Sequence, residues 1–121
     1  YLADDEARAT THLERIVRRL GTDRTHLLHR YLHDDGLGDT HAAFTVCGLW
    51  YAQALATLGR CDEAERILEE TLAHSNHLGL LSEDIDPVSG ALWGNFPQTY
   101  SHAGIILVAA ALDSQARSGP R

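Results

Sequence analysis

The sequence has only two cysteines, three prolines and no long apolar run. Two cysteines make no disulfide framework, and because Cys47 and Cys61 lie in or beside apolar stretches, we expect two buried free thiols. This leaves the compartment open and favours a reducing, cytoplasmic one. The longest apolar run, residues 103–112, has about half the length that a membrane span needs, so we expect a core helix and no membrane partner.

Positive charge is also scarce. The 10 basic residues are all arginines and stand against 17 acidic ones, which gives a formal charge of −7. Such a surface repels phosphate backbones, so nucleic acid is not an expected partner. With 121 residues and 44% of them hydrophobic, the composition is that of one folded domain. The chain starts at Tyr1 without a signal peptide, from which we expect a processed or excised piece.

Apolar periodicity predicts four helices, at residues 4–20, 42–58, 62–77 and 101–113. The first and third are apolar on one side, and Asp62 and Glu65 form a capping box that starts the third. The second and fourth are apolar nearly all round, and Ser101 is the expected N-cap of the fourth. Outer and inner helices therefore alternate, which favours part of an α/α barrel over a four-helix bundle.

The connections between these helices differ in length. Residues 22–41 and 78–100 form two long loops at one end, whereas the short "GRCD" turn lies at the other, so we expect a site at the long-loop end. The turn signal "DPVSG" predicts a small β-hairpin within residues 80–96. A carboxylate held there has the chemistry of a general base on water in sugar hydrolysis, and Trp93 and Tyr100 have flat faces on which sugars stack.

Three stretches together resemble a known family. "DDGLGDTHAAFTVCGLW", "ALATLGRCDEAERILEETLAHSNHLGLLSEDIDP" and "GALWGNFPQTYSHAGII" are similar, in this order, to the C-terminal part of bacterial glucoamylase-like and trehalase-like proteins of glycoside hydrolase family 15. The resemblance implies the C-terminal portion of an all-α (α/α)6 barrel that hydrolyses α-glucosidic bonds with inversion. It places the general base at Glu83, with Asp84 beside it. The general acid of the family comes from an earlier segment that nothing here matches.

The resemblance also implies residues that contact the substrate, an α-glucoside or oligosaccharide. Arg30 matches a position beside the bound glucose, and we expect Asp35, His41 and Trp93 to contribute to the same site. His41 and Ala42 stand where the family commonly has an acid and a glycine, which affects substrate choice. We expect neither a cofactor nor a metal.

The resemblance assigns residues 1–115 to the barrel and leaves 116–121 as a flexible tail. A chain with Glu83 but without the general acid is expected to be inactive alone. Its inner helices, 42–58 and 102–113, would expose apolar faces that the rest of the catalytic domain or a second copy covers.

Other interpretations were open at this point. His26, His29 and His33 would share one side of a helix, and His74 and His77 would lie one turn apart, which raises the possibility of a metal site. Structural zinc, however, normally takes four ligands with cysteine among them. We therefore expect His26 and His33 to be solvated and His102 to be hydrogen-bonded at a helix start. Acidic side chains suit calcium but lack a spaced loop motif. "ALATLGRCDEAERILEETL" also resembles one tetratricopeptide repeat of a protein-binding module, although the pattern does not recur about 34 residues away.

Overall fold

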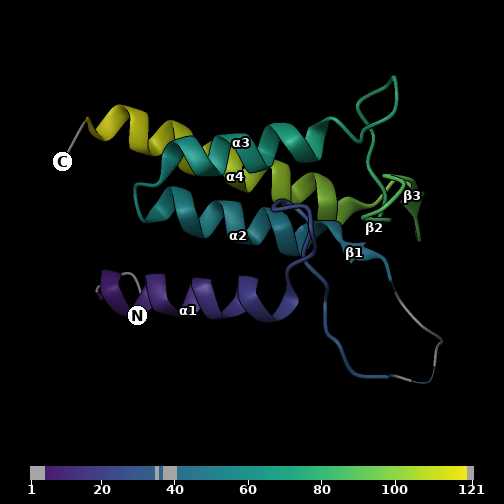
Figure 1. The fold of residues 1–121 in the computed structure, drawn as a ribbon. Coiled ribbons are helices and arrows are strands. Elements are labelled where there is room, and N and C mark those ends of the chain that lie inside the picture. The colour runs from purple at the N-terminus through teal and green to yellow at the C-terminus, as the bar shows by residue number, and fades with distance from the viewer. Residues whose placement is uncertain (1–4, 35, 37–40, 120–121) are drawn as a thin grey trace.

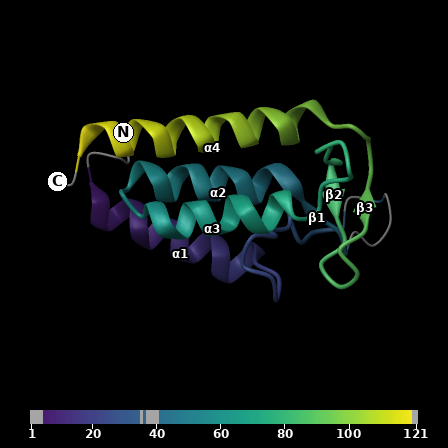
Figure 2. The same cartoon turned by 90° about the horizontal axis from the view of Figure 1, so that it is seen from above.

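The computed structural model describes residues 5–34, 36 and 41–119. Within these ranges the chain forms four helices and one three-stranded sheet (Figure 1). The elements, in chain order, are α1 (Glu6–Leu20), β1 (Ala43–Phe44), α2 (Thr45–Thr57), α3 (Cys61–Leu72), β2 (Asp84–Ile85), β3 (Leu92–Trp93) and α4 (Thr99–Ser118). The helices run side by side, and the sheet lies at one end of them (Figures 1 and 2).

Helix α1 forms as its sequence pattern predicts. The Asp5 side chain caps its start by accepting a hydrogen bond from the Arg8 N–H at 3.0 Å, and Gly21 ends it. The buried side, which includes Ala9 and Leu13, faces the rest of the domain. Outward-facing charges cover the remaining surface, which confirms the one-sided helix.

Helix α2 is the centre of the core. It packs on both α3 and α4, and Leu49 and Leu55 are fully buried in a cluster with Ile67 of α3 and Val108 of α4. Each such side chain contributes about 1.5–3 kcal/mol when it is removed from water. Helix α4 approaches α2 closely at Gly104, where a Cβ atom would lie 2.9 Å from Leu49 Cδ1. The central position of α2 confirms it as an inner helix.

Helix α4 is buried on one side. Ser101, Gly104 and Val108 are buried, whereas Ile106 is 68% exposed and Leu107 is 45% exposed. Trp50 of α2 is also exposed. The apolar faces that we expected the inner helices to expose are therefore present. No helix within the described ranges combines the length and the apolar character needed to cross a membrane.

Both ends of α3 and both ends of α4 differ from the sequence prediction. Helix α4 begins at Thr99 after Gln98 and continues to Ser118, and Ser101 is not its cap because its hydroxyl donates to the carbonyl of Ser82 at 2.7 Å. Helix α3 begins at Cys61, directly after the turn that closes α2, so Asp62 lies inside its first turn and the predicted capping box is wrong. Helix α3 ends at Leu72 and not at His77.

The strands form an antiparallel sheet in the order β1-β2-β3. Strands β2 and β3 are the hairpin that the turn signal predicted. Strand β1 was not predicted, and it passes into α2 with no residue between them. Ala43, Ile85 and Leu92 pair across the sheet, and with Leu27 they form a second small apolar cluster that fixes one face of the sheet.

Candidate active site

The other face of the sheet carries the chemistry. Asp84 pairs with Phe44 on one side and with Trp93 on the other, so the three side chains lie in one row across β1, β2 and β3. Glu83 directly precedes β2, and its backbone continues the pairing because its carbonyl accepts from the Thr45 N–H at 3.0 Å. Two neighbouring carboxylates are therefore held at the sheet end of the helices.

A small cavity opens between this sheet and the loop that follows α1. Its volume is about 100 Å³, and it is lined by Arg30, Tyr31, Ala42, Phe44, Glu83 and Asp84. The Arg30 guanidinium lies over two rings, 5.3 Å from the centre of Phe44 and 5.6 Å from that of Tyr31. Such cation–π contacts hold the guanidinium beside the cavity. One cation and two carboxylates thus converge on one hollow.

The carboxylate of Glu83 is fixed by Asn95. The Asn95 side chain donates from Nδ2 to Glu83 Oε2 at 2.7 Å, and the Asn95 N–H donates to the same oxygen at 3.2 Å. The main chains are joined as well, since the Glu83 N–H donates to the Asn95 carbonyl at 2.9 Å. Two donors on one oxygen set the rotation of the carboxylate and leave its second oxygen, Oε1, to other partners.

Gly94 makes room for both carboxylates. Its φ of +73° is in the region that favours glycine. A Cβ atom at this position would lie 3.0 Å from Asp84 Oδ2 and 3.1 Å from Glu83 Oε2. A side chain at residue 94 would therefore press on the two acids.

Asp84 has a perturbed ionisation. Burial raises the pKa of this carboxyl from 3.8 to about 6, and the neighbouring charge of Glu83 adds to the rise, while Arg30 opposes it. The pair therefore carries a proton on Asp84 at mildly acidic pH. A cavity carboxyl with a strongly raised pKa is typical of functional sites.

The structure brings together part of the predicted site. Glu83 and Arg30 line the same cavity, as the convergence of the two long loops predicted. Trp93 is 59% exposed on the same sheet face as Asp84, but it does not line this cavity. His41 is exposed and also lies outside the cavity lining. Asp35 falls outside the described residues.

Sequence reasoning missed several residues of this site. Phe44 and Tyr31, which hold Arg30, read as ordinary apolar positions. Asn95 and Gly94 follow the hairpin, and only the register of β2 with β3 shows that they return to Glu83. An Asx residue directly after a glycine at a hairpin end was the available signal.

A larger hollow of about 900 Å³ lies at the opposite end of the helices. It is lined by the start of α1, the turn between α2 and α3, and the end of α4, and it contains carboxylates from Glu6, Glu65 and Asp113. No arginine or histidine lines it in the described part of the chain, so it lacks the mixed charges found at the sheet end.

Of the histidines with a predicted environment, His26 departs from it, whereas His33 and His102 agree with it. The prediction that His26 is solvated is wrong, because it is 6% exposed and hydrogen-bonded, whereas His33 is exposed as expected. His102 is confirmed as a hydrogen-bonded histidine at a helix start, since its Nε2 accepts from the Leu81 N–H at 3.3 Å. Residues 22–33 do not form the helix that would align His26 with His29 and His33. Within the described ranges, no three potential ligands are placed to hold a metal ion.

Alternating helices around a buried α2, with a carboxylate-bearing sheet at one end, are consistent with part of a helical barrel of the kind found in glycosidases. The chain matches the model of the glycosyl hydrolases family 15 over residues 2–110, and it belongs to this family. This membership favours the hydrolase interpretation over the helical-repeat module.

The similar proteins are trehalases. The chain is 43% identical over 111 residues to a trehalase of Thermoplasma volcanium and 35% identical over 107 residues to a trehalase of Mycobacterium tuberculosis. The first alignment covers 92% of this chain but 18% of the relative, and the second covers 88% and 16%. The resemblance seen in the sequence was to bacterial proteins. An archaeal and a mycobacterial trehalase both match, so the likeness is not restricted to bacterial members. No solved structure matches the chain significantly.

Proposed function

We propose that this chain supplies Glu83 as the general base of an inverting glycoside hydrolase of the trehalase type. The observation that carries the proposal is the geometry of Glu83, which lies at the cavity with Oε2 bound by Asn95. The family membership and the trehalase relatives support the reaction class. Trehalose, an α-glucoside with two joined anomeric carbons, is the proposed substrate.

In the proposed reaction, Glu83 Oε1 takes a proton from a water molecule as the water oxygen attacks one anomeric carbon of trehalose. The bond from that carbon to the glycosidic oxygen breaks, and this oxygen leaves with the second glucose after receiving a proton from a general acid. Attack from the opposite side inverts the first carbon, so one β-glucose and one α-glucose form. The general acid is proposed to come from a part of the barrel outside this chain, which leaves the chain inactive by itself.

The residues around Glu83 have proposed roles in holding the sugar. Arg30, which its two aromatic neighbours hold at the cavity, donates hydrogen bonds to glucose hydroxyls. Asp84 next to it accepts or donates according to its protonation. Trp93 offers an exposed flat face on the same side of the sheet. Asp35 and His41 remain proposals that rest on the family resemblance.

The test uses the full-length protein that carries this chain, with trehalose as substrate. Glu83→Gln keeps the hydrogen-bonding shape but removes the base, so kcat is expected to fall about 100- to 10,000-fold. Glu69→Gln on the exposed side of α3 is the matched control and should leave kcat unchanged. Proton NMR during the first turnovers should show β-glucose and α-glucose in equal amounts. A Glu83→Gln variant with near-normal kcat, or products that are both α, would contradict the proposal.

A further inference from the structure

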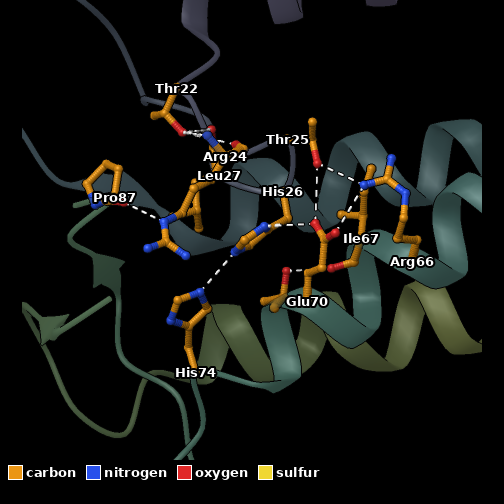
Figure 3. A network of polar contacts seen from close by, with 11 residues as sticks. Thr22, Arg24, Thr25, His26, Leu27, Arg66, Ile67, Glu70, His74 and Pro87 are labelled. Carbon is orange, nitrogen blue, oxygen red and sulfur yellow. Dashed lines mark hydrogen bonds and ion pairs between the residues drawn. The ribbon is translucent and has the colours of Figure 1, made fainter. Parts of the chain in front are cut away.

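Apart from the candidate active site, a histidine pair joins the loop after α1 to the end of α3. His26 Nε2 lies 2.9 Å from His74 Nε2, and the rings are 5.1 Å apart between centres. The outer nitrogens also have partners: His26 Nδ1 is 3.0 Å from Glu70 Oε2, and His74 Nδ1 is 3.3 Å from the Gly90 carbonyl oxygen. Figure 3 shows His26 between Glu70 and His74 in this row of contacts.

The backbone also holds His26 in place. Its carbonyl oxygen lies so close to Gly48 of α2 that any side chain at residue 48 would collide with it. The His26 ring then points toward α3, where it is 6% exposed. The pair therefore links α2, α3 and the turn of the β2–β3 hairpin, and His26 cannot turn to water without leaving these contacts.

The partners dictate where protons are needed. Burial acts to raise the pKa of Glu70, but the hydrogen bond and the charge of Arg66 outweigh burial and lower that pKa below its usual value. The carboxylate is therefore ionised and accepts a hydrogen bond from His26 Nδ1. The Gly90 carbonyl also only accepts, which requires a proton on His74 Nδ1. Between the two Nε2 atoms there is room for one proton, because one nitrogen must donate and the other accept.

Three protons thus satisfy four ring nitrogens, whereas two neutral imidazoles carry only two protons. The completed row contains one neutral histidine and one imidazolium, with the negative charge of Glu70 next to it. We propose that His26 and His74 form a binding site for one excess proton, which fastens the turn of the β2–β3 hairpin to the end of α3 while it is bound. This inference is independent of the proposed catalytic reaction.

The surroundings of His26 disfavour its charged form. Burial lowers the pKa of His26, and the charges of His74 and Arg24 lower it further, while Glu70 opposes them. His26 is therefore the neutral member, with its proton on Nδ1 and a bare Nε2 that accepts from His74. From the hairpin, the carbonyl of Gly90 faces the pair, and the hairpin carboxylate of Asp86 accepts from backbone N–H groups of its own turn.

Either loss or gain of one proton breaks this row of hydrogen bonds: loss leaves too few N–H donors, and gain leaves too many. When rising pH removes the excess proton, His74 keeps one N–H and must give up either Gly90 or His26. When falling pH adds a second proton, two Nε2–H groups face each other at 2.9 Å and the rings must separate. Arg24 still donates to the carbonyls of Pro87 and Val88, so the hairpin stays attached while its contact at Gly90 is lost.

The direct test is the nitrogen NMR spectrum of the chain labelled with 15N-histidine, with His26→Asn and His74→Gln used to assign the signals. Near pH 6 the row of contacts requires protons on both nitrogens of His74 and on His26 Nδ1, with His26 Nε2 bare. At about pH 9 one of these three protons should be missing. Only two protons on the pair near pH 6, or both His26 nitrogens protonated there, would overturn the proposal.

A second measurement follows the hairpin itself. The Gly90 N–H is bonded to the Asp86 carbonyl at 2.8 Å, and its hydrogen-exchange protection reports the order of the turn. After correction for intrinsic exchange rates, protection should fall about five- to tenfold as the excess proton is lost, which is the factor for one hydrogen bond. His74→Gln should abolish this pH dependence, and the exposed His77→Gln should retain it. Equal profiles for all three proteins would show that the pair does not fasten the hairpin.

Discussion

Asn95 holds Glu83 through two hydrogen bonds to one carboxylate oxygen, at 2.7 Å from the side chain and 3.2 Å from the main chain. The side-chain bond is removable without breaking the strand pairing, which uses the backbone of the same residue. A substitution at Asn95 can therefore change the orientation of the Glu83 carboxylate while the carboxylate itself stays in place.

Asn95→Ala tests that orientation in the full-length protein. Because the carboxylate keeps its charge but gains rotational freedom, kcat for trehalose should fall about 10- to 100-fold, with KM nearly unchanged. Gln115→Ala, at the far end of α4, is the control and should match the wild type. An unchanged kcat in Asn95→Ala would show that the side-chain bond does not position Glu83.

Alanine substitutions at two glycines with nearly the same φ distinguish the cost of backbone strain from the cost of steric crowding. Gly94 has a φ of +73° and lies against Glu83 and Asp84, whereas Gly79 has a φ of +76° with open space where a Cβ would be. Gly79→Ala should lower the free energy of unfolding by about 1 kcal/mol through strain alone. Gly94→Ala should cost about 1 kcal/mol more and also reduce kcat, because its methyl group displaces the carboxylates. Urea titrations of the two variants make the comparison, and equal losses would exclude crowding.

Asp84 makes stability depend on pH in a defined direction. Its pKa is raised from 3.8 to about 6 in the folded chain, so the folded state holds the proton more tightly than the unfolded state. The resulting stabilisation is complete below about pH 4 and is lost as pH rises through about 6. Because the cavity is partly solvated, we expect the loss to be about 1–2 kcal/mol relative to Asp84→Asn.

Urea denaturation of both proteins at several pH values measures this difference. The gap between Asp84→Asn and the wild type should widen in favour of the variant as pH rises. Asp62→Asn, at an exposed position of α3, provides the control for a carboxylate outside the cavity. Parallel stability curves for wild type and Asp84→Asn would refute the raised pKa.

The contact of α4 with α2 at Gly104 predicts a further effect. Alanine has the higher helix propensity by about 1 kcal/mol, but its Cβ would lie 2.9 Å from Leu49 Cδ1 and 3.0 Å from Leu49 Cβ. Overpacking should dominate, so Gly104→Ala should destabilise the chain by about 1–2 kcal/mol. In a Leu49→Ala background the same substitution should become less harmful, because the pair is in contact. Additive effects in a thermal unfolding cycle would contradict this explanation.

The exposed side of α4 bears on self-association. Ile106 and Leu107 of α4 and Trp50 of α2 place apolar surface in solvent, and such surface favours association. Sedimentation of the 121-residue chain should show concentration-dependent dimers or larger species. Ile106→Glu should shift it toward monomer, whereas Ser114→Glu, an exposed position of the same helix, should not. A monomeric wild type at high concentration would contradict this prediction.

The sequence predicts the features that depend on local patterns. The one-sided character of α1, the buried α2 and the β2–β3 hairpin follow from periodicity and turn residues. Contacts between residues that are far apart in the chain cannot be predicted from these local patterns. Ser101 reads as a helix cap until Ser82 is placed beside it, and His26 reads as a surface histidine until Gly48 admits its backbone to α2. Strand β1 is hidden at the start of an apolar run because its partner strand, β2, lies in a different loop.

The direct passage of β1 into α2 has a mechanical consequence. Phe44 ends the strand and Thr45 begins the helix, while Phe44 pairs with Asp84 and α2 packs on α3 and α4. Because no linker residue separates β1 from α2, the sheet and the helical core move together at this point. A ligand that moves Asp84 must either rotate α2 against its neighbours or break the pairing of two residues. Tight packing resists the first, so the floor of the candidate site is set by the core before any ligand arrives.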